Sequence, residues 1–291
     1  MNRFELSCNI IKVHNMKHLK EVAAEVKLKS GFSMPIIGLG TWQLKGNECV
    51  GTIKTAFQLG YRHFDTAISY GNEEEIGKAL GGVDRESIFI TSKVPPIDLK
   101  YEDVITSCRQ SLERLKTNYL DLLLIHWPND EIPIKNTFSA FKKLVDQKII
   151  RSFGVSNYTI ERLETELPIA KDMGLVISAN QVEYHPGLNQ EDLLDYCVNK
   201  DIALVAYSPL GRGDILAESV LGEIGQNYSK TKVQVSLRWL TQKGIVAIPK
   251  SSSKQHLKEN LDIFDFSLTD EEIEIIDDLG NSQRLINPEL F

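Results

Sequence analysis

Eight short apolar segments, most of them rich in Val, Ile, Leu and Phe, recur along the chain, and amphipathic helical patterns lie between them. Nearly continuous apolar runs of this length are typical of parallel strands that are buried on both faces. Because the pattern runs strand then helix eight times, we predict a closed (β/α)8 barrel of the TIM type. The predicted strands cover residues 36–40, 64–67, 88–94, 119–127, 150–156, 176–182, 203–207 and 245–249, and clear helical patterns cover 102–116, 135–147, 160–173, 190–199 and 231–243.

The length of 291 residues is compatible with two domains, but barrels of this size commonly form one. No Pro- or Ser-rich linker, low-complexity tract or solenoid repeat divides the chain. We therefore expect one barrel domain over residues 25–291 and a poorly ordered extension over residues 1–24. Segments 26–28 and 34–36, joined by Lys29-Ser30-Gly31, are predicted to form a hairpin that closes the bottom of the barrel.

The net charge is −7, from 33 basic and 40 acidic residues. The chain therefore lacks the excess of basic residues that proteins binding nucleic acid or anionic lipid carry, and we expect neither partner. No segment has the length of a signal peptide or a transmembrane span. The four cysteines are widely spaced and suit a reducing cytoplasm. His14 and His18 lack the Glu of a zincin motif, so no metal is expected. We expect a cytoplasmic protein, and a monomer because no heptad or long apolar edge indicates assembly.

Four polar residues, Asp65, Tyr70, Lys93 and His126, fall at or just after the C-terminal ends of predicted strands two to four. In such barrels these ends form the catalytic face. A tyrosine has a pKa of roughly 10, and a nearby cation such as Lys93 is expected to lower it toward the range of a general acid. Asp65 is expected to keep Lys93 charged, and a neutral His126 to donate a second hydrogen bond to a substrate oxygen. Together they predict a site that gives a proton to a carbonyl oxygen.

Each of the four residues also has a structural interpretation. A lone lysine is usually solvated, an aspartate at a strand end often caps a helix, and a buried histidine is more often a satisfied core group. The catalytic hypothesis therefore depends on all four lying together.

Three common nucleotide-binding or catalytic motifs are absent from the sequence. Gly38-Leu39-Gly40 lacks the third glycine of a dinucleotide fingerprint because position 43 is Gln, and the segment from Gly154 to Tyr158 lacks the closing glycine of a nucleophile elbow. There is also no P-loop. A bound nucleotide would have to lie on the barrel loops.

From about residue 26 to about residue 279 the chain resembles the aldo-keto reductase superfamily. Within it the chain is most similar to compact microbial members, such as diketogluconate reductases, methylglyoxal reductases and prostaglandin F synthase-like enzymes. The segments that carry the resemblance, in order, are MPIIGLGTW (34–42), YRHFDTA (61–67), YGNE (70–73), LIHWP (124–128), GVSNY (154–158), NQVEYHP (180–186), AYSPLG (206–211) and IPKS (248–251).

The resemblance implies NADPH-dependent reduction of aldehydes and ketones, with Tyr70 as proton donor. It assigns the nicotinamide carboxamide to Ser156, Asn157 and Gln181, with Tyr207 stacked under the ring. The remaining implied cofactor contacts are Ser208 and Leu210 at the pyrophosphate, Lys250 and Ser251 at the 2′-phosphate, and Glu259 and Asn260 at the adenine. Amides and hydroxyls suit a carboxamide, and a lysine suits a phosphate.

One position departs from the family pattern. Where relatives usually carry an arginine that pairs the 2′-phosphate, this chain has His256, with Lys254 and Lys258 beside it. A histidine is only partly charged near neutrality and lacks the bidentate fork of arginine. We expect NADPH to be preferred over NADH by a smaller margin than usual, and the margin to widen at lower pH.

Trp42 and Trp127 follow predicted strand ends and are expected to wall the substrate pocket, although either has a core interpretation. Short loops in this region indicate an open pocket for small aldehydes, dicarbonyls and keto sugars. The alternative is a catalytically weak NADPH-binding regulatory or structural subunit of the same fold, since the fold alone does not establish turnover. The complete tetrad argues against that alternative.

Overall fold

The computed structural model describes residues 25–213, 219–280 and 284–286. The predicted extension over residues 1–24, with His14 and His18, lies outside the described residues. No helix within these described ranges is long and apolar enough to cross a membrane.

Eight parallel strands form one curled sheet in the order β10-β9-β8-β7-β6-β5-β4-β3. The barrel is closed between its first and last strands by a parallel bridge from Ile37 to Ala247 and by hydrogen bonds from the amides of Gly38 and Ala247. The predicted barrel is therefore confirmed. Its strands are β3 (Leu39–Gly40), β4 (His63–Asp65), β5 (Phe89–Val94), β6 (Leu120–Ile125), β7 (Ile150–Ser156), β8 (Ile177–Glu183), β9 (Ala203–Tyr207) and β10 (Val246–Ala247).

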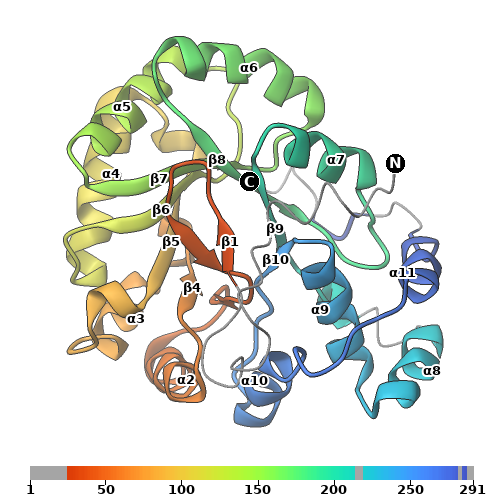
Figure 1. The fold of residues 1–291 in the computed structure, drawn as a ribbon. Coiled ribbons are helices and arrows are strands. Elements are labelled where there is room, and N and C mark those ends of the chain that lie inside the picture. The colour runs from red at the N-terminus through yellow and green to blue at the C-terminus, as the bar shows by residue number, and fades with distance from the viewer. Residues whose placement is uncertain (1–24, 214–218, 281–283, 287–291) are drawn as a thin grey trace.

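Helices surround the sheet (Figure 1), and their apolar faces cover buried strands such as Leu120–Ile125, in which every residue is buried. Side-chain caps begin several helices; Thr231 and Gln234 form a reciprocal capping box, as do Thr269 and Glu272. The helices are α2 (Gly46–Leu59), α3 (Glu73–Ala79), α4 (Tyr101–Leu115), α5 (Ile134–Asp146), α6 (Ile160–Asp172), α7 (Glu191–Asn199), α8 (Ser219–Tyr228), α9 (Lys232–Gln242), α10 (Lys254–Leu261) and α11 (Asp270–Asp277).

A two-stranded hairpin of β1 (Glu25–Lys27) and β2 (Ser33–Pro35) precedes the barrel and lies across its N-terminal end (Figure 1). Val26 pairs with Met34, and both side chains are fully buried. The turn is fixed to the barrel by a 2.6 Å hydrogen bond between the hydroxyls of Ser30 and Ser152, near the start of β7. The predicted hairpin is confirmed, and it leaves the opposite, C-terminal end of the barrel for the functional site.

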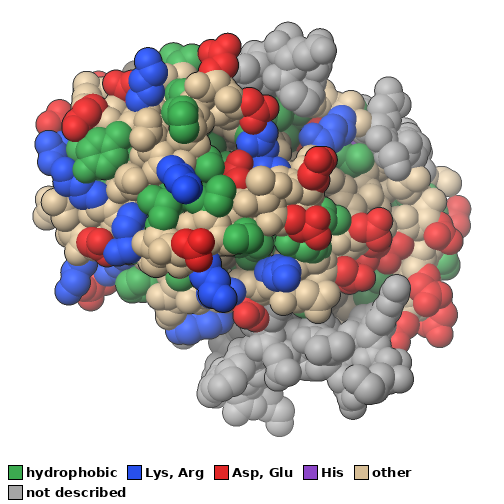
Figure 2. Space-filling view, turned by 90° about the horizontal axis from the view of Figure 1, so that it is seen from above, with side chains coloured by type: hydrophobic (Ala, Val, Ile, Leu, Met, Phe, Trp, Pro, Cys, Tyr) green, Lys and Arg blue, Asp and Glu red, His purple; other side chains and the backbone are tan. Residues whose placement is uncertain are grey.

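Charged side chains of both signs are intermixed over much of the surface that Figure 2 shows, with acidic groups more frequent toward one edge. Among the described residues the large apolar side chains with more than a third of their surface exposed are Phe32, Trp42, Ile97, Val176 and Ile275.

Candidate active site

The four predicted catalytic residues meet at the C-terminal end of the barrel. Asp65 is the last residue of β4, Lys93 lies in β5, and His126 directly follows β6. Tyr70 ends a short 3-10 helix, η2 (Ile68–Tyr70), that follows β4. Lys93 Nζ donates to Asp65 Oδ1 in a short ion pair, lies 5.0 Å from the centroid of the Tyr70 ring, and donates to the Thr66 carbonyl at 2.8 Å. The rings of Tyr70 and His126 meet edge to face, with centroids 5.7 Å apart.

A chain of hydrogen bonds connects this ion pair to the predicted carboxamide-binding residues. Gln181 Nε2 donates to Asp65 Oδ2 at 2.7 Å, and the Gln181 carbonyl accepts from the Ser156 hydroxyl at 2.8 Å. Asn157 Nδ2 donates to the His126 carbonyl at 3.1 Å, while its Oδ1 accepts from the Tyr207 hydroxyl at 2.8 Å. The two predicted groups of residues therefore form one connected network.

Burial sets the protonation states of the site. Burial raises the pKa of Tyr70 and outweighs the opposing effect of the Lys93 charge, so the expectation that Lys93 brings this pKa below its ordinary value is wrong. Burial disfavours the charged form of Lys93, but Asp65 and Tyr70 outweigh it and hold the Lys93 pKa above its ordinary value. Burial and the Lys93 charge lower the pKa of His126 to about 3. Tyr70 is thus a protonated phenol, Lys93 a cation and His126 a neutral ring at neutral pH.

A cavity of about 490 Å³ opens beside the tetrad. Trp127 is 8% exposed and Trp42 is 38% exposed, so Trp42 stands nearer the mouth. The lining includes Asp65, Tyr70 and His126 of the tetrad, both tryptophans, and the predicted cofactor residues Ser156, Asn157, Gln181, Tyr207, Ser208, Leu210 and Lys250.

Residues 36–281 match the profile of the aldo/keto reductase family. The chain belongs to this family. It is 44% identical over 263 residues to glyoxal reductase of Bacillus subtilis (strain 168), covering 89% of this chain and 94% of that protein. It is 41% identical to the 9,11-endoperoxide prostaglandin H2 reductase of Trypanosoma cruzi (strain CL Brener), covering 89% and 93%. An aldo-keto reductase from a Medee basin deep-sea metagenome library has a TM-score of 0.86 at 36% identity, covering 90% of this chain and 97% of its own.

The family resemblance seen in the sequence is therefore confirmed, and the chain is an oxidoreductase. Four predicted cofactor residues of this aldo/keto reductase lie outside the cavity lining, in the segment that follows Lys250. Ser251 accepts from the Ser253 amide before α10, and His256 is exposed in the first turn of α10. Glu259 accepts from Gln255 at 2.8 Å, and Asn260 is 2% exposed with no hydrogen-bond partner in the described structure for Oδ1.

Three residues that the sequence did not single out contribute to the site. The Ser69 hydroxyl lies 3.3 Å from His126 Nδ1. Arg212 lines the cavity, and its guanidinium carbon lies 4.9 Å from the centroid of the Trp42 ring. Ile286 also lines the cavity, from the far end of the chain. Ser69 adjoins Tyr70, and Arg212 follows Leu210 by two residues, so the predicted site residues beside them were a signal that could have identified both. No predicted site residue lies near Ile286 in the sequence.

Proposed function

We propose that this aldo/keto reductase uses NADPH to reduce small aldehydes and ketones, with Tyr70 as the proton donor. The single observation that carries the proposal is the hydrogen-bond network that joins the Lys93–Asp65 ion pair through Gln181 to the cavity. A protein that only bound a nucleotide would have no need for a buried cation beside a protonated phenol.

Tyr70, Lys93 and His126 have different proposed roles at the substrate oxygen. The Tyr70 hydroxyl donates its proton to that oxygen, and Lys93 stabilises the phenolate that remains. His126, neutral because burial and Lys93 lower its pKa to about 3, donates a second hydrogen bond as negative charge develops. When bound, the reduced nicotinamide supplies a hydride to the carbonyl carbon.

The described residues fit a phosphorylated dinucleotide. Lys250 and Arg212 bring two cations to one cavity, and cations of this kind bind phosphate. Ser156, Asn157 and Gln181 present the hydroxyl and amide groups that a carboxamide requires, and Tyr207 offers a ring beside them. Ser208 and Leu210 are proposed for the pyrophosphate, and Ser251, His256, Glu259 and Asn260 for the adenosine end.

The proposed substrates are small carbonyl compounds, glyoxal and methylglyoxal among them. The support is the open cavity with its two tryptophans and the 44% identity to a protein named glyoxal reductase. We further propose that the protein is a monomer that acts in the cytoplasm.

The test is NADPH oxidation with glyoxal, methylglyoxal and 4-nitrobenzaldehyde, comparing the wild type with Tyr70→Phe and Lys93→Met. Loss of a general acid typically lowers the rate by about 10²- to 10⁴-fold, so Tyr70→Phe should bind NADPH and lose turnover. Lys93→Met should do likewise, because it removes the charge that stabilises the phenolate. Tyr101→Phe, a tyrosine in α4 outside the cavity lining, is the control and should retain full rate. NADPH binding with no turnover of any carbonyl by the wild type would favour the binding-only alternative.

Cofactor preference is tested by measuring the dissociation constants of NADPH and NADH between pH 6 and pH 8. We expect NADPH to bind more tightly, by a ratio that grows at lower pH as a histidine near the 2′-phosphate gains charge. His256→Gln is the control, because the 2′-phosphate also titrates in this range and its contribution remains in the variant. A ratio that has the same pH dependence in both proteins would remove His256 from the proposal.

A further inference from the structure

The carboxylate of Glu183, at the end of β8, is fully buried and accepts three hydrogen bonds. The amide of Leu285 donates to Oε1 at 2.8 Å and the amide of Ile286 donates to Oε2 at 3.0 Å. His185 Nε2 lies 3.1 Å from Oε1. Two of these donors come from a segment about a hundred residues later in the chain, so the carboxylate fastens that segment to the barrel.

This fastening lies beside the active-site cavity. Glu183 pairs in register with Tyr207, which lines the cavity, and Ile286 lines the same cavity as Trp42 and Trp127. Gln190 Nε2 also donates to the Glu183 carbonyl at 2.6 Å, which fixes the backbone that presents the carboxylate.

We propose that Glu183 is a positioning residue that holds Ile286 in the cavity wall, and that this wall favours carbonyl compounds with an aromatic or other apolar substituent over the smallest dicarbonyls. The proposal rests on the carbonyl reduction proposed above.

The energetics support a strong anchor. Hydrogen bonds to an ionised group are roughly twice as strong as neutral ones, and a buried carboxylate without donors would be costly. Burial alone raises the pKa of Glu183, but the bonds from His185 and from the amides of Leu285 and Ile286 outweigh it and hold the pKa below its ordinary value. Glu183 therefore remains ionised, and both amides keep a charged acceptor at neutral pH.

The wall can contribute to selectivity because its effect depends on substrate size. One methylene in an apolar pocket changes the discrimination between two substrates by about 10- to 200-fold. A substituent such as a nitrophenyl ring can reach apolar surface from Ile286 and the tryptophans, whereas glyoxal has no apolar group to place there.

The experiment compares Glu183→Gln and Ile286→Ala with the wild type by two measurements. The first is hydrogen exchange of the Leu285 and Ile286 amides in the full-length protein by NMR, which is independent of turnover. The second is the ratio of kcat/KM for 4-nitrobenzaldehyde to that for glyoxal. Glu164→Gln, the same change at an exposed position in α6, is the matched control.

We expect Glu183→Gln to speed exchange of both amides by about tenfold and to lower the substrate ratio by about tenfold, with Ile286→Ala lowering the ratio to a similar extent. The double variant should lower it no further, because both changes act through one contact. Unchanged amide exchange in Glu183→Gln, or equal losses for both aldehydes, would overturn the proposal. If the wild type reduced no carbonyl, the proposed function would fail while amide exchange would still report on the anchor.

Discussion

Tyr70 holds its proton more tightly than an exposed tyrosine does, although Lys93 stands beside it, because burial penalises the phenolate more than one nearby cation favours it. For the proposed reduction this is the useful direction, since the phenol is the form that would donate the proton. Lys93 only partly offsets this rise in the resting site, and in the proposed reaction its charge would stabilise the phenolate that forms.

The Ser69 hydroxyl is within hydrogen-bond distance of His126 Nδ1, at 3.3 Å, and either atom could be the donor. A neutral imidazole donates from one nitrogen and accepts at the other, so a Ser69 hydroxyl that donates to Nδ1 leaves the proton on Nε2. We expect Ser69→Ala to lower kcat about fivefold, the equivalent of one neutral hydrogen bond, and Ser69→Thr to restore most of the rate. The ¹⁵N chemical shifts of the His126 ring should move toward a mixture of tautomers in the alanine variant. Unmoved shifts would show that Ser69 does not choose the tautomer.

The tetrad could be predicted because each of its residues lies at or just after the C-terminal end of a predicted strand. These strand ends meet at one end of a barrel. Ser69, Arg212 and Ile286 were not predicted, for different reasons. Ser69 reaches the site through a contact with His126, 57 residues away, and Ile286 lines the cavity from a segment whose amides bond to Glu183, about a hundred residues earlier. Contacts between distant positions leave no local pattern in a single sequence.

At the scale of elements, strands and helices with strong patterns were predicted closely. The predicted strands 150–156 and 203–207 match β7 and β9, and the predicted helix 160–173 differs from α6 by one residue. The prediction of eight strand-then-helix units gave one helix after β9, whereas the structure has two, α8 and α9. Hydrophobic periodicity identifies a helix, but it does not show whether that helix is one of the eight that follow the strands of the barrel or an extra helix between them.

The close packing of α3 against α4 was also not predicted from the sequence. A Cβ on Gly77 would approach the carbonyl oxygen of Arg114, in the last turn of α4, to 2.4 Å. The glycine is therefore required by a close approach between two helices, which only the tertiary structure reveals.

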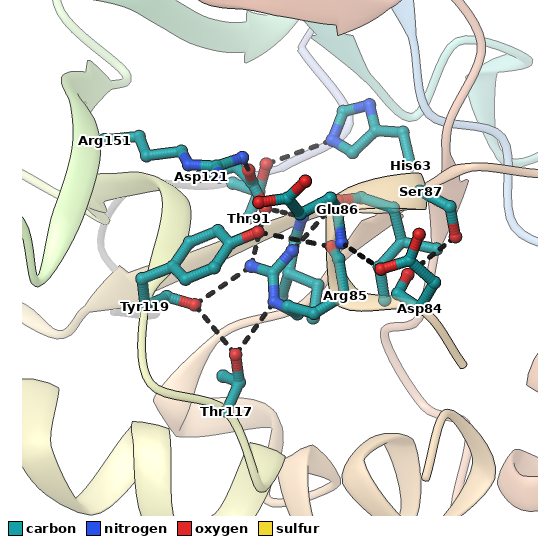
Figure 3. Close-up of polar contacts among 12 residues, drawn as sticks. His63, Asp84, Arg85, Glu86, Ser87, Thr91, Thr117, Tyr119, Asp121 and Arg151 are labelled. Atoms are coloured by element: carbon teal, nitrogen blue, oxygen red, sulfur yellow. Dashed lines mark hydrogen bonds and ion pairs between the residues drawn. The ribbon is translucent and has the colours of Figure 1, made fainter. Parts of the chain in front are cut away.

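Three neighbouring strands are held at the N-terminal end of the barrel by one carboxylate (Figure 3). Asp121 of β6 accepts from the Arg85 guanidinium at 2.6 Å, from that of Arg151 in β7 at 3.0 Å, and from the Ile90 amide of β5 at 2.9 Å. Both guanidinium carbons lie 3.9 Å from the centroid of the Tyr119 ring. The cluster is thus a charged and aromatic clamp, distant in the fold from the catalytic end.

We expect Asp121→Asn to lower the free energy of unfolding by about 3 kcal/mol, because it removes the buried carboxylate and leaves two partly buried guanidiniums without their counter-charge. Asp146→Asn is the matched control; it removes an exposed i,i+4 pair with Lys142 and should cost at most about 0.5 kcal/mol. Urea unfolding measures both. Equal losses in the two variants would mean that the clamp contributes no more than a surface ion pair.

At the scale of the whole molecule, acid stability depends on groups that the barrel keeps uncharged. His63, at the start of β4, is fully buried; its Nε2 lies 3.0 Å from the Thr91 hydroxyl (Figure 3), and its ring meets Phe89 edge to face. A Cβ on Gly38 would lie 2.6 Å from His63 Nδ1, so little space surrounds the ring. Burial lowers the pKa of His63 to about 4, mainly because the charged ring would lose its hydration.

The unfolded chain binds a proton at His63 near pH 6.5, whereas the folded chain resists it down to about pH 4. Stability is therefore complete above the unfolded pKa and is lost as the pH falls from there toward the folded pKa. This residue alone should remove about 2 kcal/mol between pH 7 and pH 5. His63→Asn should be less stable than the wild type at pH 7 but lose about 2 kcal/mol less over that interval, measured by urea unfolding. The exposed His256→Asn should keep the wild-type pH dependence, and a His63→Asn protein that also kept it would show that burial of His63 does not limit acid stability.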